Sequence, residues 1–454
     1  MSAQSESWSG RAGFILAAIG AAVGLGSIWK FPYEVGANGG GAFVLCYLLG
    51  LALVVAPLML AEFALGRRGG ADAATSLERV AAAHGARRRW SALGLFGIAA
   101  GLLILSFYSV IGGWTLAYVA DTARHGLPGA DPAAVQARFD ALLASPLVMA
   151  SYHALFLALT AAVVGRGVRA GIETACTVLM PALVLLMAGL AAYGVLEGDL
   201  RATLAFLFRF SADDLTPRVA LEALGLGFFS IGVGIGLMLT YAAYAGAAID
   251  LRQAAIVSLL GDTAISFLAG FAVFPLVFAH GLDPAGGAGL VFVTLPIAFA
   301  GLPFGTLAAF AFFVLLFVAA FASAISLLEL AVALLVRRYG WRRATATAVL
   351  APASFAGGLA TVFSFNLWSD WYPLAALPGF AQATVFDLID HLTSNLMLPL
   401  GGFLLSVFAG WVLPAKLLAE ELGLGASGAR RLRFALRYVA PAGIAAAALA
   451  PLLA

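Results

Sequence analysis

The segment Phe14–Pro32, FILAAIGAAVGLGSIWKFP, begins as an apolar helix and loses every helix-favouring property between residues 21 and 27. Three glycines here, Gly20, Gly24 and Gly26, each cost about 1 kcal/mol relative to alanine inside a helix. Apolar sequence nevertheless continues on both sides for long enough to cross a bilayer. Unwound backbone at membrane depth is tolerated only where it faces protein or a wet cavity. The interruption therefore needs a structural or functional reason.

Two interpretations of this interruption are open from the stretch alone. Half-helix ends and bare carbonyls at the bilayer midplane suit the binding of ions and a small charged solute. Small residues at helix crossings also allow close packing in membranes. The choice depends on whether the rest of the chain contains a matching break.

The composition identifies a polytopic membrane protein. The 454 residues are 63% hydrophobic and 11% charged, with a mean hydropathy of +1.01, whereas soluble domains carry about 25% charged residues. A net charge of +2 is too small to indicate nucleic-acid binding. Cys46 and Cys176 lie in apolar runs, which favours buried side chains over a disulfide framework or a metal site. The N-terminal sequence MSAQSESWSGR lacks the pattern of a signal peptide, so we expect the first span to be retained.

Apolar runs predict about eleven transmembrane helices and an all-α integral membrane protein. The runs fall near residues 12–36, 41–66, 91–122, 147–165, 170–196, 217–247, 253–280, 304–336, 344–364, 383–413 and 432–453. With a cytoplasmic N-terminus, most Arg and Lys residues lie in cytoplasmic loops, and the opposite loops carry only Arg124, Arg138, Arg201, Arg209 and Arg218. The positive-inside rule then predicts a multi-pass protein of the plasma (inner) membrane, with its C-terminus outside.

A second broken span opens the second half of the chain. The sequence FFSIGVGIG, Phe228–Gly236, interrupts the sixth apolar run. Broken segments that open two five-span halves predict inverted repeats with a site at their interface. We expect a single domain, 1–454, with repeats at 12–196 and 217–413 and an eleventh span at 432–453. Short helices that lid an outer vestibule are expected in the outer loops at 123–146, 197–216, 281–303 and 365–382.

Specific motifs then carry a resemblance to a known family. They cover nearly the whole chain and read GAAVGLGSIWKFPY, NGGGAFVLCY, PLMLAEFALGRRGG, LSFYSVIGGWTLAY, GFFSIGVGIGLMLTYAAY, ASAISLLE and FDLIDHLTSNLMLPLGG. Together they resemble the neurotransmitter:sodium symporter family, in particular its bacterial amino-acid transporters. The resemblance implies sodium-driven uptake of amino acids or related solutes by alternating access, and it favours a binding site at the first break.

The resemblance places the substrate carboxylate against the unwound first span. The amides around Leu25 and Gly26 and the Tyr108 hydroxyl would bind it. Amine transporters of the family carry an aspartate at the position of Gly24, so this chain resembles the amino-acid transporters. Backbone amides at a helix N-terminus and a phenol suit an anion, which an aspartate would repel.

The resemblance also implies a pocket for the substrate side chain. Its expected lining is Ala22, Ile104, Phe229, Ser230, Gly232, Ile235, Ser323 and Leu327. Gly232 and Ile235 replace a serine and a phenylalanine of bacterial leucine transporters, which removes volume from the wall. A larger hydrophobic or aromatic amino acid should therefore fit.

The first sodium site implied by the family uses the Ala22 carbonyl, Ser27, Ser230, Asp262 and the substrate carboxylate. Hard oxygen donors suit a small cation, and the shared carboxylate couples ion to substrate. Ser27 and Asp262 depart from the asparagines that are usual here. Chloride-dependent members bind the anion beside this site, near Tyr47, Ser230 and Ser266, with a glutamine where this chain has Leu226. The fixed carboxylate of Asp262 favours chloride independence.

The second sodium site implied by the family uses the carbonyls of Gly20, Val23 and Ala319 and the hydroxyl of Ser323. Ala322 stands where bacterial relatives usually offer a threonine hydroxyl. One ligand is therefore missing or replaced by water, and sodium affinity or stoichiometry is in question. Proton coupling through Asp262 and Glu62 is an alternative, because buried carboxyls in membranes pair with a cation or a proton.

The gates are also inferred from the family. Lys30 and Asp390, with Asp387 one turn earlier, are expected to pair when the outer vestibule closes. At the inner side, relatives pair a basic residue near Ser5 with an acid where this chain has Arg337. Trp8 and Tyr244 are retained and are expected to close this side by packing, and Glu6 or Asp250 is a candidate partner for Arg337.

Other function classes receive less support. A transporter-like amino-acid sensor with little flux is an alternative, given Ala322 and the changed inner gate, and a channel is less consistent with closed ion sites. The sequence groups no nucleophile, base and orienting residue, so we expect neither an enzyme nor a cofactor, with Na⁺ as the coupling ion. The expected partners are an amino acid, sodium ions and the lipid bilayer.

Overall fold

The computed structural model describes residues 6–129, 131–284 and 289–449, and these residues form helices and no strand. The N-terminal half contains α1 (Arg11–Ala22), η1 (Gly26–Lys30), α2 (Phe31–Ala37), α3 (Gly41–Gly50), η2 (Leu51–Val55), α4 (Ala56–Gly69), α5 (Ala73–Ala83), η3 (Arg88–Trp90), α6 (Ser91–His125), α7 (Pro132–Leu143), α8 (Pro146–Gly165), η4 (Val168–Glu173), α9 (Thr174–Glu197) and α10 (Leu200–Phe208). Elements named η are single turns of 3₁₀ or π helix, and most of them continue directly into an α-helix.

The C-terminal half is likewise built from α-helices and short π turns. It contains α11 (Pro217–Ile231), α12 (Leu237–Ala242), α13 (Leu251–Ala279), η5 (Leu290–Thr294), α14 (Leu295–Ala300), α15 (Gly305–Tyr339), α16 (Arg343–Ser364), α17 (Val385–Asp390), η6 (His391–Met397), α18 (Leu398–Val407), η7 (Phe408–Val412), α19 (Ala415–Leu422), α20 (Ala426–Phe434), η8 (Ala435–Val439) and α21 (Ala440–Leu449). The predicted short helices are present in three outer loops as α7, α10 and α14. Residues 365–382 instead form turns without a helix.

Both predicted breaks are present, and each is shorter than the sequence indicated. In the first span, α1 ends at Ala22 and helical structure resumes at Leu25, with a bend of 53° between the two helical parts. In the second, α11 continues through Phe228 to Ile231, so only residues 232–236 are unwound. Gly234 in this break has φ +94°, and a Cβ there would lie 2.7 Å from the Gly402 amide. A positive φ and this close approach both require glycine.

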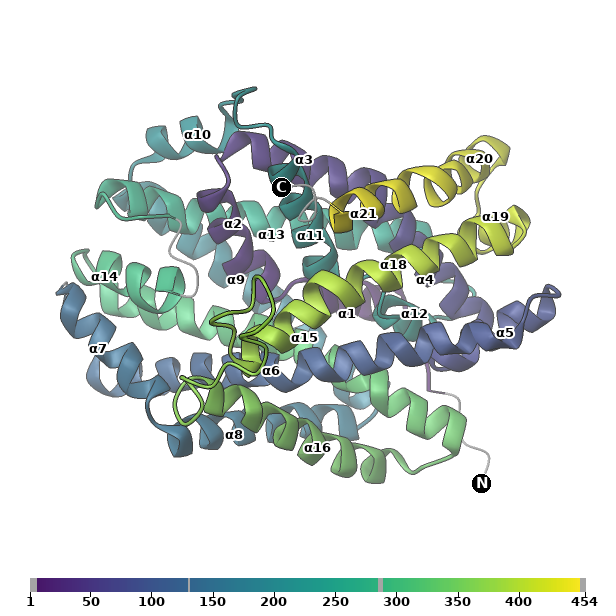
Figure 1. The fold of residues 1–454 in the computed structure, drawn as a ribbon, viewed down its shortest axis with the longest axis horizontal. Helices are drawn as coiled ribbons and strands as arrows, with labels where there is room; N and C mark the ends of the chain where they lie inside the picture. The colour runs from purple at the N-terminus through teal and green to yellow at the C-terminus, as the bar shows by residue number, and fades with distance from the viewer. Residues whose placement is uncertain (1–5, 130, 285–288, 450–454) are drawn as a thin grey trace.

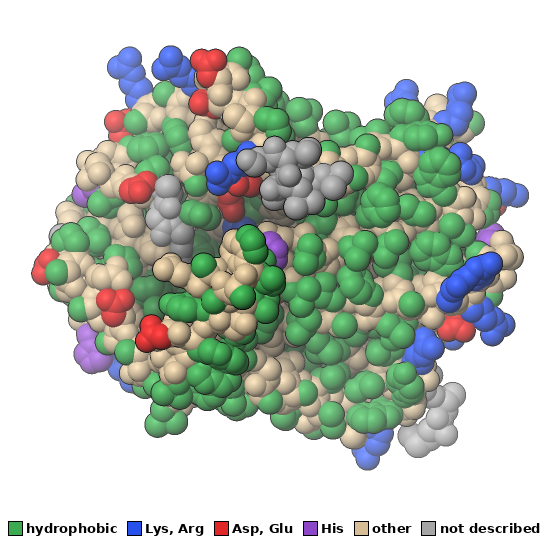
Figure 2. All heavy atoms as spheres, in the orientation of Figure 1, with side chains coloured by type: hydrophobic (Ala, Val, Ile, Leu, Met, Phe, Trp, Pro, Cys, Tyr) green, Lys and Arg blue, Asp and Glu red, His purple; other side chains and the backbone are tan. Residues whose placement is uncertain are grey.

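Eight helices among the described residues are long and apolar enough to cross a membrane, and the bent first span makes a ninth. The sixth and eleventh predicted spans do not meet this criterion. The sixth is divided into α11 and α12, and the eleventh runs through α20, η8 and α21 to residues outside the described part. Figure 2 shows hydrophobic side chains covering the middle of one face, with Lys and Arg gathered mainly at its ends. This distribution fits a multi-pass membrane protein.

The broken first span lies inside the helical bundle. Helix α1 packs against α9, α13 and α15, and the long helices α6 and α15 pack along each other. Figure 1 shows α1 and α12 surrounded by the longer helices. Within and after the break, Ala22, Val23, Gly24 and Leu25 are buried. The two breaks are therefore shielded from lipid, as unwound backbone in a membrane requires.

Candidate functional site

A cavity of about 50 Å³ lies between the two breaks. All twelve residues predicted to bind substrate line it, namely Ala22, Gly24, Leu25, Gly26, Ile104, Tyr108, Phe229, Ser230, Gly232, Ile235, Ser323 and Leu327. Ala21, Leu237 and Leu398 also line it and were missed. Leu398 lies on α18, far along the chain from every other lining residue, and no local pattern distinguishes it from packing leucines. The residues converge as predicted, while their role in binding substrate stays a prediction.

Polar groups of the cavity gather around the first break. The Leu25 amide donates a hydrogen bond to the Tyr108 hydroxyl across 3.2 Å, and both residues are buried. A Cβ at Gly24 would lie 2.5 Å from Ser323 Oγ and 2.8 Å from the Tyr108 hydroxyl. Any side chain at Gly24 would therefore displace these groups. No Asp, Glu, Lys or Arg is among the residues lining the cavity.

Three predicted ligands of the first sodium site form one buried cluster. Ser27 Oγ donates to the Asp262 carboxylate and lies 3.0 Å from Ser230 Oγ, and Ser230 Oγ lies 2.9 Å from the carboxylate. The Tyr47 hydroxyl donates to the other Asp262 oxygen across 3.2 Å. Asp262 is fully buried. These oxygens suit a hard cation such as Na⁺, because they combine a carboxylate with hydroxyl ligands.

The neighbourhood of this cluster also fits the sequence predictions. Ser266, one turn after Asp262 on α13, is buried, and its hydroxyl has no hydrogen-bond partner among the described residues. Leu226 is buried as well. An apolar side chain therefore stands where chloride-dependent members of the family carry a glutamine. In the described part of the chain, no three His, Cys, Asp or Glu side chains gather as a metal site. The cluster is thus an oxygen site with one carboxylate.

The predicted second sodium site brings the first break against α15. Ser323 Oγ lies 3.2 Å from the Val23 carbonyl and 3.4 Å from the Gly20 carbonyl. Ala319 is fully buried one turn before Ser323. Ser323 also lines the cavity, so one side chain touches both predicted sites. The Ala322 position offers no side-chain oxygen, as expected from the sequence.

Glu62 on α4 holds the second break in place. Its carboxylate accepts hydrogen bonds from the Gly234 amide at 2.7 Å and the Leu239 amide at 3.2 Å, and the residue is fully buried. The proposed role of Glu62 as a proton carrier stays a prediction. The geometry also gives it a positioning role, because it pairs backbone donors that unwinding leaves without a helical partner. Its signal in the sequence was an acid within an apolar run.

At the end of the cavity near α2, Lys30 stacks over an aromatic ring. Its Nζ lies 4.6 Å from the centroid of Phe229, which lines the cavity. In the described residues no ion pair joins Lys30 to Asp390, whose carboxylate accepts a hydrogen bond from Ser394. Asp387 caps its own helix through Thr384. The predicted outer pairing is therefore not formed in this conformation, and its role stays a prediction.

At the opposite end, Trp8 closes over the start of α1. Its indole donates to the Tyr241 carbonyl across 2.8 Å, and its ring packs edge-on against Tyr241 and Tyr244. Ser9, the next residue, donates to Glu173 at the start of the fifth span through both its amide and its hydroxyl. The packing role predicted for Trp8 and Tyr244 agrees with this arrangement. No sequence motif indicated this contact of Glu173.

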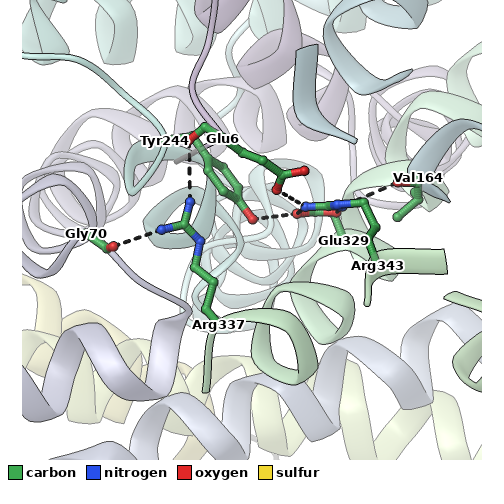
Figure 3. A network of polar contacts seen from close by, with 7 residues as sticks. All are labelled: Glu6, Gly70, Val164, Tyr244, Glu329, Arg337 and Arg343. Carbon is green, nitrogen blue, oxygen red and sulfur yellow. Dashed lines mark hydrogen bonds and ion pairs between the residues drawn. The ribbon is translucent and has the colours of Figure 1, made fainter. Parts of the chain in front are cut away.

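A charged cluster surrounds Tyr244, and Figure 3 shows its members converging from different parts of the chain. We call Glu6, Tyr244, Glu329, Arg337 and Arg343 the inner network. Arg343 forms ion pairs with Glu6 and with the fully buried Glu329, the latter at 2.5 Å. Tyr244 donates to Glu329 across 2.6 Å. The guanidinium of Arg337 lies 4.5 Å from the Tyr244 ring centroid and donates to the Gly70 carbonyl.

This network corrects the predicted inner pairing. The Glu6 carboxylate pairs with Arg343. Arg337 reaches the Glu6 backbone carbonyl at 3.5 Å and does not pair with its carboxylate. Asp250 caps α13 through the Gln253 amide at 3.0 Å. Ser5 lies outside the described residues. Glu329 was overlooked because it ends an otherwise apolar motif, and no local pattern places Arg343 beside it.

Comparisons with known proteins agree on the class. The chain matches the model of the "Sodium:neurotransmitter symporter family" over residues 5–137 and 147–385, and it belongs to this family. The crystal structure of MhsT in complex with L-phenylalanine superimposes with a TM-score of 0.90, at 39% identity over 98% of this chain and 99% of that chain. This likeness confirms the predicted fold class, that of an all-helical membrane transporter.

Curated relatives also match along most of their length. An uncharacterized sodium-dependent transporter of Bacillus subtilis, YhdH, is 36% identical over 96% of this chain and 95% of its own. An uncharacterized sodium-dependent transporter of Methanocaldococcus jannaschii, MJ1319, is 32% identical over 92% of this chain and 84% of its own. The chain is thus a member of a family of sodium-dependent membrane transporters.

Proposed function

We propose that this protein is a sodium-coupled secondary active symporter that imports hydrophobic or aromatic L-amino acids by alternating access, independently of chloride. The observation that carries the proposal is the lining of the cavity. One wall offers the Leu25 amide and the Tyr108 hydroxyl, and the rest is mostly apolar. Such a pocket suits a molecule with one carboxylate and an apolar side chain.

The steric environment of Gly24 supports an amino acid over an amine. An aspartate there, as in the family's amine transporters, would have to displace Ser323 and Tyr108. The glycine at position 232 and the isoleucine at 235 leave room for a larger side chain. L-phenylalanine in the MhsT crystal structure, at 39% identity, is consistent with that size.

The ion coupling rests on the cluster around Asp262. A fully buried carboxylate surrounded by hydroxyls is costly without a cation or a proton. A sodium ion there would share the substrate carboxylate and couple the two bindings. Because Asp262 supplies a fixed negative charge, a bound chloride is not required. We place the N-terminus in the cytoplasm, so the inner network faces the cytoplasm and Lys30 faces outward.

The first test is uptake into proteoliposomes under imposed ion gradients. We expect concentrative uptake of L-phenylalanine with an inward sodium gradient, and competition by leucine, tyrosine and tryptophan that exceeds competition by glycine or alanine. Uptake driven by a pH gradient alone would overturn sodium coupling. Binding without concentrative uptake under either gradient would indicate a sensor.

A second test addresses the anion. Replacement of chloride by gluconate should leave sodium-driven uptake unchanged in the wild type. In an Asp262→Asn variant we expect uptake to become chloride-dependent or to be lost. A severalfold fall in wild-type uptake without chloride would contradict the assignment of this charge to Asp262.

A further inference from the structure

Phe304 occupies a strained position at the surface. With φ +55° it is the only non-glycine residue with positive φ in the described part of the chain, and its side chain is 81% exposed. A bulky residue in this region of backbone space is a true outlier, and its backbone is strained. The Tyr193 hydroxyl helps to hold the turn, because it donates to the neighbouring Pro303 carbonyl across 2.8 Å. The exposed Phe304 ring therefore stands at the surface of this turn.

Two grooves meet at this ring. One, of about 670 Å³, lies between the ends of α6 and α14 and the start of α15, and we call it the α6–α15 groove. The other, of about 240 Å³, lies between α9 and α15, and we call it the α9–α15 groove. Phe304 and Leu307 line both, so they form a ridge between the grooves. Leu307 is 65% exposed, and the ridge therefore stands out from the bundle.

The two grooves differ in polarity. The α9–α15 groove is lined by apolar groups apart from Tyr193 at its end, and it includes Gly189 and Leu185. The α6–α15 groove contains Thr122 and Thr306. Thr122 is 97% buried, given its 3% exposure, and its hydroxyl has no hydrogen-bond partner among the described residues. A buried hydroxyl without a partner in a roomy groove indicates a missing polar ligand.

An exposed cation follows directly in the chain after two residues that line this groove. Arg124 follows Thr122 and Ala123 at the end of α6 and is exposed, and in the described residues its guanidinium forms no ion pair. This end of α6 thus combines an exposed cation with a buried hydroxyl at the groove, and the two grooves continue from it.

We propose that this surface binds one diacyl phospholipid of the outer leaflet. Its two acyl chains lie in the two grooves on either side of the Phe304–Leu307 ridge. The phosphate contacts Arg124, and an ester oxygen accepts a hydrogen bond from Thr122. The match of charge, hydroxyl and paired grooves to one amphipathic molecule favours a lipid over a second copy of this chain. The proposal does not depend on the transported substrate.

Gly189 provides a direct test. A Cβ at Gly189 would meet nothing within 4 Å, so Gly189→Leu places bulk in the α9–α15 groove without a clash and removes a helix glycine. Gly225→Leu is the matched control, because Gly225 is an exposed helix glycine with equal space on α11. Native mass spectrometry of the purified full chain would measure binding of dioleoyl phosphatidylglycerol.

We expect wild type and Gly225→Leu to retain one tightly bound lipid, and Gly189→Leu to bind about tenfold more weakly, the loss expected when about two chain methylenes leave the groove. The single-chain lysophosphatidylglycerol should bind more weakly than the diacyl lipid to wild type and to Gly225→Leu, whereas Gly189→Leu should distinguish the two lipids less. Equal retention by all three proteins, or a cross-linked dimer through the ridge, would overturn the proposal.

The polar end is tested separately. Arg124→Gln should remove the preference of the protein for dioleoyl phosphatidylglycerol over dioleoylglycerol, which lacks the phosphate. Thr122→Val should weaken both lipids by a similar factor, because it removes the hydroxyl while the shape is kept. An unchanged preference in Arg124→Gln would show that the phosphate does not lie at this end.

Discussion

The inner network and the Lys30–Phe229 contact lie at opposite ends of the broken first span, and they use charge differently. The inner network joins two acids and two arginines, with Glu329 fully buried and the Arg343 side chain only 11% exposed. The other end has one ammonium over an aromatic face, while Asp390 bonds within its own helix. Breaking a buried ion pair costs about 3–5 kcal/mol, whereas a cation–π contact contributes about 0.5–2 kcal/mol. We infer that this conformation is held more firmly at the inner end.

The largest effect is expected from Arg343→Met. Removal of this guanidinium leaves the Glu329 carboxylate buried without a charge partner, which should lower the free energy of unfolding by about 3–5 kcal/mol. Thermal unfolding in detergent would measure the loss. The exposed neighbour Arg342 provides the control variant Arg342→Met, which should change little.

A double variant separates the ion pair from lost packing. In Arg343→Met combined with Glu329→Gln, the buried charge is gone, and we expect most of the stability to return. If the double variant is as unstable as the single one, the methylene packing of Arg343 dominates and the ionic comparison between the two ends fails.

The positions of the two unwound segments and the residues lining the cavity were predicted well from sequence, because local motifs mark both. Glycine runs inside apolar helices mark unwinding, and the family motifs place Tyr108 and Ser323 opposite the first break. The inner network could not be predicted in the same way. Glu6 lies in the segment before α1, Glu329 lies on α15 and Arg343 begins α16. A salt bridge between separate segments depends on tertiary packing, which no local sequence pattern determines.

The length of each unwound segment also could not be predicted from local sequence. Three glycines between Gly232 and Gly236 identified the second break, yet the helix persists through Phe228 to Ile231. Tertiary contacts decide such boundaries. Here Glu62 binds the amides of Gly234 and Leu239, and it thereby fixes where the unwound segment ends. Asp387 and Asp390 of the predicted outer gate likewise accept hydrogen bonds from residues of their own helical segment, Thr384 and Ser394.

A smaller effect is expected from Glu6→Gln. The Glu6 side chain is 31% exposed, and Arg343 would retain Glu329, so the loss should be about 1 kcal/mol. The consequence should be local opening at the N-terminal segment. Cys176 reports on it, because it is fully buried and its Sγ lies beside Gly20 on the first span.

Alkylation of Cys176 by a membrane-impermeant maleimide, in a Cys46→Ser background, would measure that opening. We expect a rate about fivefold higher in Glu6→Gln than in wild type, because the free energy of local opening should fall by about 1 kcal/mol. Asp250→Asn is the control, since Asp250 only caps α13. Equal rates in all three proteins would show that Glu6 does not hold the inner end closed.

The smallest effect is expected from Lys30→Met at the other end. The variant keeps an apolar side chain over Phe229 and removes only the ammonium, so apparent amino-acid affinity should fall about two- to fivefold, in line with about 0.5–1 kcal/mol for an exposed cation–π contact. Lys30→Arg should retain or exceed wild-type affinity, because a guanidinium also stacks on aromatic faces. Lys416→Met, which removes an exposed ammonium near Glu420, is the control. Competition binding of L-phenylalanine would measure all three variants. A hundredfold loss in Lys30→Met would mean that Lys30 forms a buried ion pair during transport, and the two ends would then use charge alike.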